Sequence, residues 1–267
     1  TLGFSVWGQA LQNESEFVAA MGELEEGERL VGRAIALCQQ HDMVEALGWA
    51  LGAHPVIQDW MGARPGSPAI DETLRRAGQA IDAAERSGSP YSRCQAYRSL
   101  ALAYTLSESW PEAIEAAELS LALARDESGL EREACILALL ARAHRGHGEG
   151  AAALAFAEEA VARAEQRGTA YFGIEAELEL ARSLRAVRGR EAADDIARCL
   201  DRGVRAVAQT GGRALAPQLI EEQARLAELR GDADAATAKL REAHETYLEI
   251  GAQGHAERLA EQIGGSG

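Results

Sequence analysis

The stretch that decides the fold is PYSRCQAYRSLALAYTLSESWPEAIEAAELSLALARD, which runs from Pro90 to Asp126. Its first half carries residues that recur at i, i+3, i+4 and i+7, as expected for one face of a helix: Tyr97, Leu100, Ala101 and Tyr104. The first half of this stretch therefore predicts an amphipathic helix.

The second half of the stretch begins after Ser107-Glu108-Ser109, which interrupt the helical pattern. Trp110 and Pro111 then open a second helix, with Pro111 in the first turn, where its missing N–H costs nothing. Ala113 follows as a small residue at the place where the two helices must approach closely. The whole stretch predicts two helices joined by a tight turn.

The same arrangement repeats along the chain. A small residue followed by an aliphatic one marks each second helix, and a last copy has a polar second member: Ala34-Ile35, Ala80-Ile81, Ser120-Leu121, Ala160-Val161, Gly203-Val204 and Ala243-His244. Successive copies are 46, 40, 40, 43 and 40 residues apart. The turn-rich linker Gly62–Pro68 accounts for the spacing of 46, and extra residues after Gly189 account for the spacing of 43. A repeat of this length is typical of stacked helix pairs, none of which can bury its apolar face alone.

We therefore predict an all-α fold, a right-handed α-α superhelix of six helix pairs that forms one domain over residues 1–267. The pairs are expected over residues 4–41, 43–88, 90–127, 130–168, 171–211 and 215–251. A short helix over residues 255–263 is expected to cap the last pair.

Composition and charge narrow the classes of function. The net charge is −15 and the pI is about 4.9, so the surface repels phosphate backbones and nucleic-acid binding is not expected. No stretch of 18 or more apolar residues is present, so no membrane span or membrane partner is expected.

The cysteines and tryptophans are expected to serve packing. The four cysteines are far apart in sequence and form no CxxC pair, which predicts buried free thiols in a reducing, cytoplasmic compartment: Cys38, Cys94, Cys135 and Cys199. The tryptophans lie in or beside apolar stretches and are expected to pack in the core: Trp7, Trp49, Trp60 and Trp110. Because the chain starts at Thr1 without Met, we expect a fragment of a longer protein.

The order of large, large-small, aromatic and small residues resembles the tetratricopeptide repeat, in the longer form with about forty residues per unit. The tail LREAHETYLEIGAQGHAERLAEQIG, residues 240–264, resembles the C-terminal end of bacterial multidomain signalling ATPases. In these proteins a class III adenylate/guanylate cyclase domain, a STAND/AAA-type ATPase and a tetratricopeptide array lie in one chain. Residues 3–5, 88–93 and 251–259 carry the same resemblance. No cyclase motif and no Walker A sequence is present, so the resemblance implies no catalytic residue in this chain.

Two kinds of residue pattern invite a chemical interpretation, but neither supports a catalytic or metal site. His144 and His147 are spaced like two zinc ligands, yet only Glu149 is nearby as a third and His144 occupies an aromatic place of the repeat. The acid pairs Asp194-Asp195 and Glu221-Glu222 point in different directions on their helices, so neither predicts a catalytic dyad. The sequence therefore predicts no catalytic, cofactor or metal site.

One charged pattern does suggest a binding site. Arginines stand one or four residues after the small residue of three successive first helices: Arg142, Arg145, Arg182, Arg185 and Arg225. Such offsets lie toward the concave surface of a tetratricopeptide array. Their guanidinium groups could bind a partner's carboxylates or phosphates in pairs. Alternatively, Glu179, Glu221 and Glu222 pair with them as a solvated face.

The function expected from these observations is a non-catalytic interaction or regulatory module of a bacterial signalling protein, linked to a cyclase or STAND ATPase. Its partner would be a protein segment or a neighbouring domain of the same chain. The first alternative is a repeat domain that senses a small molecule, such as a small anionic ligand, in a transcriptional or signalling regulator. The second is a free-standing scaffold protein.

Overall fold

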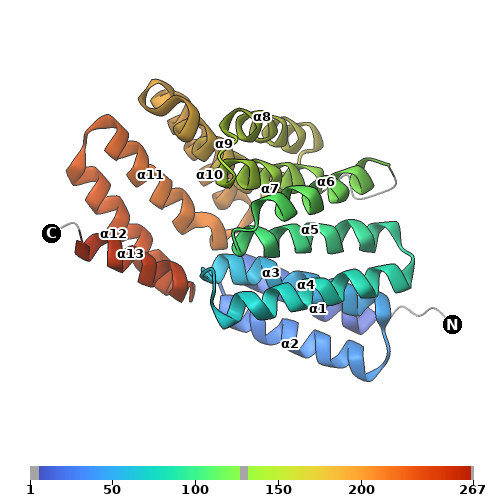
Figure 1. Cartoon of the computed structure of the whole chain (residues 1–267). Coiled ribbons are helices and arrows are strands. Elements are labelled where there is room, and N and C mark those ends of the chain that lie inside the picture. The colour runs from blue at the N-terminus through green and yellow to red at the C-terminus, as the bar shows by residue number, and fades with distance from the viewer. Residues whose placement is uncertain (1–5, 127–131, 266–267) are drawn as a thin grey trace. The chain divides into compact units, whose positions relative to one another are not determined.

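The computed structural model describes residues 6–126 and 132–265, and every regular element in these ranges is a helix (Figure 1). The two helices of each pair pack as an antiparallel hairpin, as the predicted α-helical solenoid requires. Contacts between residues divide the chain into two compact units, residues 1–130 and 131–267, and each is described by itself. None of the helices in the described ranges is both long and apolar enough to cross a membrane.

The first unit contains three helix pairs. Its helices are α1 (Val6–Ala20), α2 (Leu24–Gln40), α3 (Val44–Met61), α4 (Pro68–Ser87), α5 (Pro90–Leu106) and α6 (Trp110–Asp126). The first helices of successive pairs also touch, α1 with α3 and α3 with α5. The core of this unit is therefore continuous from one pair to the next.

The second unit repeats this plan and adds the capping helix. Its helices are α7 (Glu133–Gly146), α8 (Gly150–Arg167), α9 (Ala170–Arg188), α10 (Ala193–Thr210), α11 (Ala216–Arg230), α12 (Ala233–Glu249) and α13 (Gln253–Gly265). Two short 3-10 helices, η2 (Gly189–Ala192) and η3 (Arg213–Leu215), precede α10 and α11. Helix α13 packs on α12, so Leu259 is fully buried at the end of the array.

The predicted architecture, helix pairs followed by a capping helix, is confirmed. The observed helix bounds differ from the predicted ones by a few residues. Pro68 is the first residue of α4 rather than the last residue of the linker, because proline at a helix N-terminus gives up no hydrogen bond. The extra residues after Gly189 form η2. The predicted ends at residues 4, 127 and 130, like the resemblance at residues 3–5, lie outside the described residues.

The hairpin of α5 and α6 forms as its sequence predicts. Ser89 caps α5 by accepting a hydrogen bond from the backbone N–H of Ser92 at 3.3 Å. Ala101 and Ala113 are both fully buried, as expected where two helices approach closely. The other residues of the predicted face of α5, Tyr97, Leu100 and Tyr104, are only half-buried. Residues outside that face, such as Cys94, are buried because α3, α4 and α6 all pack against α5.

The prediction for the cysteines agrees with the structure, whereas the tryptophans differ from one another, and Trp49 and Trp110 are only half-buried. All four cysteines are buried free thiols. Trp60 is buried, and the indole of Trp49 donates a hydrogen bond to Ser92 at 2.9 Å. The prediction that Trp7 packs in the core is wrong, since 76% of its surface is exposed. Trp7 lies in the first turn of α1 and lines a shallow hollow with Leu37, His41 and Met43, from the end of α2 and the turn that follows it.

Candidate functional site

The five predicted arginines lie on three helices of the second unit. Arg142 and Arg145 are on α7, Arg182 and Arg185 on α9, and Arg225 on α11. Helix α7 packs against α9, and α9 against α11, so the arginines come from neighbouring first helices. They interact with glutamates, one of which, Glu221, also binds Arg258 of α13. We call the set the arginine–glutamate network: Arg142, Arg145, Arg182, Arg185, Arg225, Arg258, Glu179, Glu221, Glu222 and Glu228.

The network begins at Glu179 of α9, which joins two helices. Its carboxylate accepts a hydrogen bond from Arg145 Nη2 at 2.9 Å and another from Arg182 Nη1 at 2.7 Å. The side chain of Glu179 is only 3% exposed. Burial alone would raise the pKa of this carboxyl, but the nearby charges of Arg145, Arg182 and Arg142 outweigh it and hold the pKa at about 2. Glu179 is therefore a buried, permanently charged anchor for the arginines.

Glu222 of α11 has the equivalent role in the following repeat. It accepts hydrogen bonds from both Nε and Nη2 of Arg185, the second at 3.3 Å. Arg182 Nε lies 3.8 Å from Oε2 of Glu222, the oxygen that also accepts from Arg185 Nη2. Arg182 Nη2 donates a hydrogen bond to the side-chain oxygen of Gln218 at 3.0 Å. Arg182 is thus enclosed between two buried carboxylates, Glu179 and Glu222, and its pKa is raised despite the opposing effect of burial.

Glu221 extends the network to the end of the array. Arg258 grips its carboxylate with two hydrogen bonds of 3.0 and 2.6 Å, and the hydroxyl of Tyr247 donates a third at 3.1 Å. Burial opposes ionisation, but Arg258 keeps the pKa of Glu221 below its usual range. Arg225 donates to Glu228 at 3.0 Å and to Gln262 of α13 at 2.7 Å. The capping helix, which packs on α12, is therefore also tied to α11 by polar and charged side chains.

The glutamates and arginines of the network differ in exposure. The side chains of Glu179 and Glu222 are 3% and 4% exposed, whereas that of Arg185 is 34% exposed. At these two carboxylates the glutamate is the buried member of the pair, and Arg145 and Arg185 are the members that meet solvent. The glutamates named in the sequence alternative are indeed partners of the arginines, but Glu179 and Glu222 are buried rather than solvated.

Sequence reasoning missed Arg258 and Tyr247, and it missed the burial of the glutamates. A signal for Arg258 was present, because it follows Glu221 by 37 residues, the same separation as between Arg185 and Glu222. Glu221 and Glu222 point to different partners, as predicted for adjacent residues of a helix.

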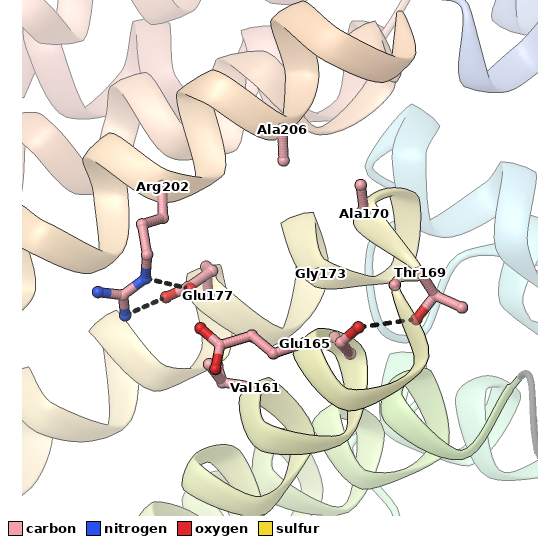
Figure 2. Close-up of a pocket in the computed structure, with 10 residues that line it drawn as sticks. Val161, Glu165, Thr169, Ala170, Gly173, Glu177, Arg202 and Ala206 are labelled. Carbon is pink, nitrogen blue, oxygen red and sulfur yellow. Dashed lines mark hydrogen bonds and ion pairs between the residues drawn. The ribbon is translucent and has the colours of Figure 1, made fainter.

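A pocket of about 250 Å³ lies elsewhere in the second unit, between the end of α8, the start of α9 and the middle of α10 (Figure 2). Its walls are mainly small or aliphatic residues: Val161, Ala164, Gly168, Ala170, Gly173 and Ala206. Glu165, Glu177 and Arg202 lie at one end (Figure 2). Arg202 holds Glu177 through two hydrogen bonds, one of them 2.8 Å long. Nothing in the sequence had pointed to this pocket.

The histidines have packing partners. His144 is buried, stacks on Phe156 at 5.1 Å between ring centroids and has its Nδ1 2.6 Å from Glu149. In the first unit, His54 of α3 is buried and joins α3 to α2 and α4. Its ring nitrogens lie within hydrogen-bond distance of Glu28, Thr73 and Arg76. Among the residues that the structure describes, no three His, Cys, Asp or Glu side chains gather as a metal site would need.

No family model matches the sequence, and no curated protein matches it either. Solved structures do share its fold. The apo form of RapI aligns with a TM-score of 0.65 over 91% of this chain and 84% of that chain, at 11% identity. A Rap protein complexed with Competence and Sporulation Factor aligns with a TM-score of 0.65 over 95% of this chain and 72% of that one, at 14% identity.

A third similar structure is a signal transduction ATPase with numerous domains (STAND) from Pyrococcus horikoshii, which has a tetratricopeptide repeat sensor. It aligns with a TM-score of 0.51 over 88% of this chain and 38% of that chain, at 17% identity. At such identities the likeness shows the fold alone, an array of tetratricopeptide-like helix pairs.

Proposed function

We propose that this chain is a non-catalytic interaction module of a signalling protein, and that the arginine–glutamate network binds an acidic or phosphorylated segment of a protein partner or of a neighbouring domain in the same chain. The observation that carries the proposal is the layering of the network, in which guanidinium groups lie over the buried carboxylates Glu179 and Glu222.

The layering favours binding in two ways. Hydrogen bonds to the glutamates fix the arginine side chains in advance, so a ligand does not have to order them. Each guanidinium carries five N–H donors in a planar fork, and donors that the glutamates leave unused can meet a carboxylate or phosphate. The net charge of −15 repels anions that fit the arginines poorly, which adds selectivity.

The parent that we propose is a cytoplasmic bacterial signalling protein linked to a cyclase or STAND ATPase. The resemblance of residues 240–264 supports this link, as does the shared fold of a STAND protein with a tetratricopeptide repeat sensor. Four buried free thiols fit a reducing compartment. In such a parent the array would bias the ATPase or cyclase when the network is occupied.

The test uses fluorescein-labelled peptides and fluorescence anisotropy. Four probes share one length: a Glu-rich peptide, a phosphoserine peptide, an uncharged Ser/Gly peptide and a Lys-rich peptide. We expect the first two to bind and the binding to weaken as salt rises, because the arginines are partly exposed. Replacement of Arg185 or Arg145 by Gln should weaken binding about fivefold each, as expected for the loss of a charged hydrogen bond at a partly exposed side chain.

Arg198→Gln is the matched control, because Arg198 is an exposed arginine of α10 that pairs with Asp195 of its own helix. Arg182 is unsuitable for this test, since it is enclosed between Glu179 and Glu222 and its loss would disturb the fold. Equal weakening by Arg198→Gln, or failure of both anionic peptides to bind, would contradict the proposal.

Small-molecule sensing is the second candidate function, and the pocket between α8, α9 and α10 is the observation that favours it. The two functions are compatible, because the pocket and the network involve different side chains.

A further inference from the structure

We propose that the pocket between α8, α9 and α10 binds a small amphipathic cation, a compact apolar body that carries one ammonium group. This inference rests on the pocket alone and does not depend on peptide binding by the network.

The walls of the pocket fit an apolar body. They consist of methyl groups, one isopropyl group and glycine backbone: Val161, Ala164, Ala170, Gly173 and Ala206. Figure 2 shows Ala170 and Ala206 across the pocket from the charged end. A volume of about 250 Å³ lies below the roughly 300–1,000 Å³ of pockets that hold drug-sized ligands. The ligand is therefore expected to be small, with an apolar body about the size of a single phenyl ring.

The charged end gives the sign of the ligand. Glu177 is 6% exposed and its charge is matched by Arg202, which binds it with two hydrogen bonds. Glu165 lies at the same end, is exposed, and makes no hydrogen bond or ion pair through its carboxylate with any residue that the structure describes, although the charge of Arg202 also attracts it from a longer distance. The two carboxylates and one guanidinium leave this end with one net negative charge. One carboxylate therefore lacks a direct partner at the edge of an apolar pocket, which is where an ammonium group would find a counter-charge while its apolar body is buried.

Two further electrostatic features affect whether the pocket prefers a cation or an anion. The net charge of −15 raises the local concentration of cations around the whole chain. The N-terminus of α9 lies at the opposite end of the pocket and favours an anion instead. The experiment therefore compares ligands of both signs.

The probes are three molecules of nearly the same shape: phenethylamine, 2-phenylethanol and 3-phenylpropionate. Binding to the full 267-residue chain is followed by titration with ¹H–¹⁵N correlation spectra, which also locate the site. We expect phenethylamine to shift the amide signals of Gly168 and Gly173. We expect 2-phenylethanol to bind more weakly and 3-phenylpropionate to bind most weakly of the three.

Two variants test the charged end and the apolar walls separately. Glu165→Gln removes the exposed carboxylate and should weaken the binding of phenethylamine about two- to fivefold, while the binding of 2-phenylethanol should stay unchanged. Ala206→Leu fills the pocket and should abolish binding of both, with thermal unfolding used to verify that the variant folds. Glu158→Gln is the matched control, since Glu158 is an exposed carboxylate of α8 that does not line the pocket.

Several results would overturn the proposal. One is tighter binding of 3-phenylpropionate than of phenethylamine, which would mean that the N-terminus of α9 and Arg202 make the pocket select an anion. Another is an equal effect of Glu158→Gln and Glu165→Gln. Tighter binding of Nα-acetyl-lysine amide than of phenethylamine would assign the pocket to a partner's lysine side chain. Absence of any shift at Gly168 and Gly173 would show that the pocket binds no amine of this class.

Discussion

Replacement of Glu179 by Gln should make the second unit less stable at neutral pH and should remove some of its sensitivity to acid. Glu179 is buried and is hydrogen-bonded to Arg145 and Arg182. The neutral amide leaves both guanidinium groups without that carboxylate. Because removal of one partner from a buried ion pair is costly, we expect a loss of about 3–5 kcal/mol in the free energy of unfolding at pH 7.

The dependence on pH follows from the lowered pKa of Glu179. A carboxyl whose pKa falls from 4.5 in the unfolded chain to about 2 in the folded one contributes ~3 kcal/mol, at about 1.4 kcal/mol for each pH unit. This contribution is fully present well above pH 4.5 and is lost as the pH falls toward 2. About 2 kcal/mol of it is already lost at pH 3. The gap in stability between the natural chain and Glu179→Gln should therefore narrow by about 2 kcal/mol between pH 6 and pH 3.

The assay is urea unfolding at pH 6, 5, 4 and 3, followed by far-UV circular dichroism. Tryptophan fluorescence is recorded in parallel, because all four tryptophans lie in the first unit and report on its unfolding separately: Trp7, Trp49, Trp60 and Trp110. Glu158→Gln serves as the control, since its exposed carboxylate makes only a long ion pair of 3.9 Å with Arg188. A gap for Glu179→Gln that stays constant from pH 6 to pH 3 would refute the assignment of Glu179 as a buried, charged anchor.

Two further predictions concern packing. Gly27→Ala should destabilise the first unit by about 1–3 kcal/mol, because the new Cβ would lie 2.6 Å from Ala19 Cβ and 3.0 Å from the Ser15 carbonyl oxygen. At Gly32 of the same helix, a new Cβ would meet no atom within 4 Å, so Gly32→Ala should stabilise the first unit by about 0.5–1 kcal/mol. Thermal unfolding of the two variants measures both effects, and equal effects would contradict the close approach at Gly27. The buried thiols should react slowly with DTNB until urea is added, because burial raises the pKa of Cys38 and raises that of Cys199 to about 12. A thiol that reacts rapidly in the native chain would contradict this expectation.

The repeat was predictable because its evidence is local. Ala101, Ala113 and Gly27 are small where two helices meet, and such residues recur at a nearly constant interval. The linker before α4 and the turn at Gly189 could be located by the same intervals. The prediction for Trp7 was wrong because an apolar side chain is buried only where other elements cover it. Trp7 lies in the first turn of α1, and the described residues that line its hollow leave most of the ring exposed.

The candidate site was only partly predictable. The spacing of the arginines placed them on neighbouring helices, but a sequence does not reveal which members of a charged cluster are buried. Arg182 and Arg185 look equivalent in sequence, yet Arg182 lies between two buried carboxylates and Arg185 reaches the solvent. The pocket was not predictable, because Glu165, Glu177 and Arg202 come from three helices and become neighbours only after packing.

The network also bears on how such an array can change its length. Arg145 of α7 binds Glu179 of α9, and Arg185 of α9 binds Glu222 of α11. The donor of each bond occupies the same place in its repeat, and so does the acceptor in the next one. Loss of the helix pair α9–α10 would bring Arg145 to the place of Arg185, opposite Glu222. Each helix pair thus presents the same donor to the next pair and the same acceptor to the one before it. The second unit could therefore gain or lose a pair without leaving a buried charge uncompensated at the new junction.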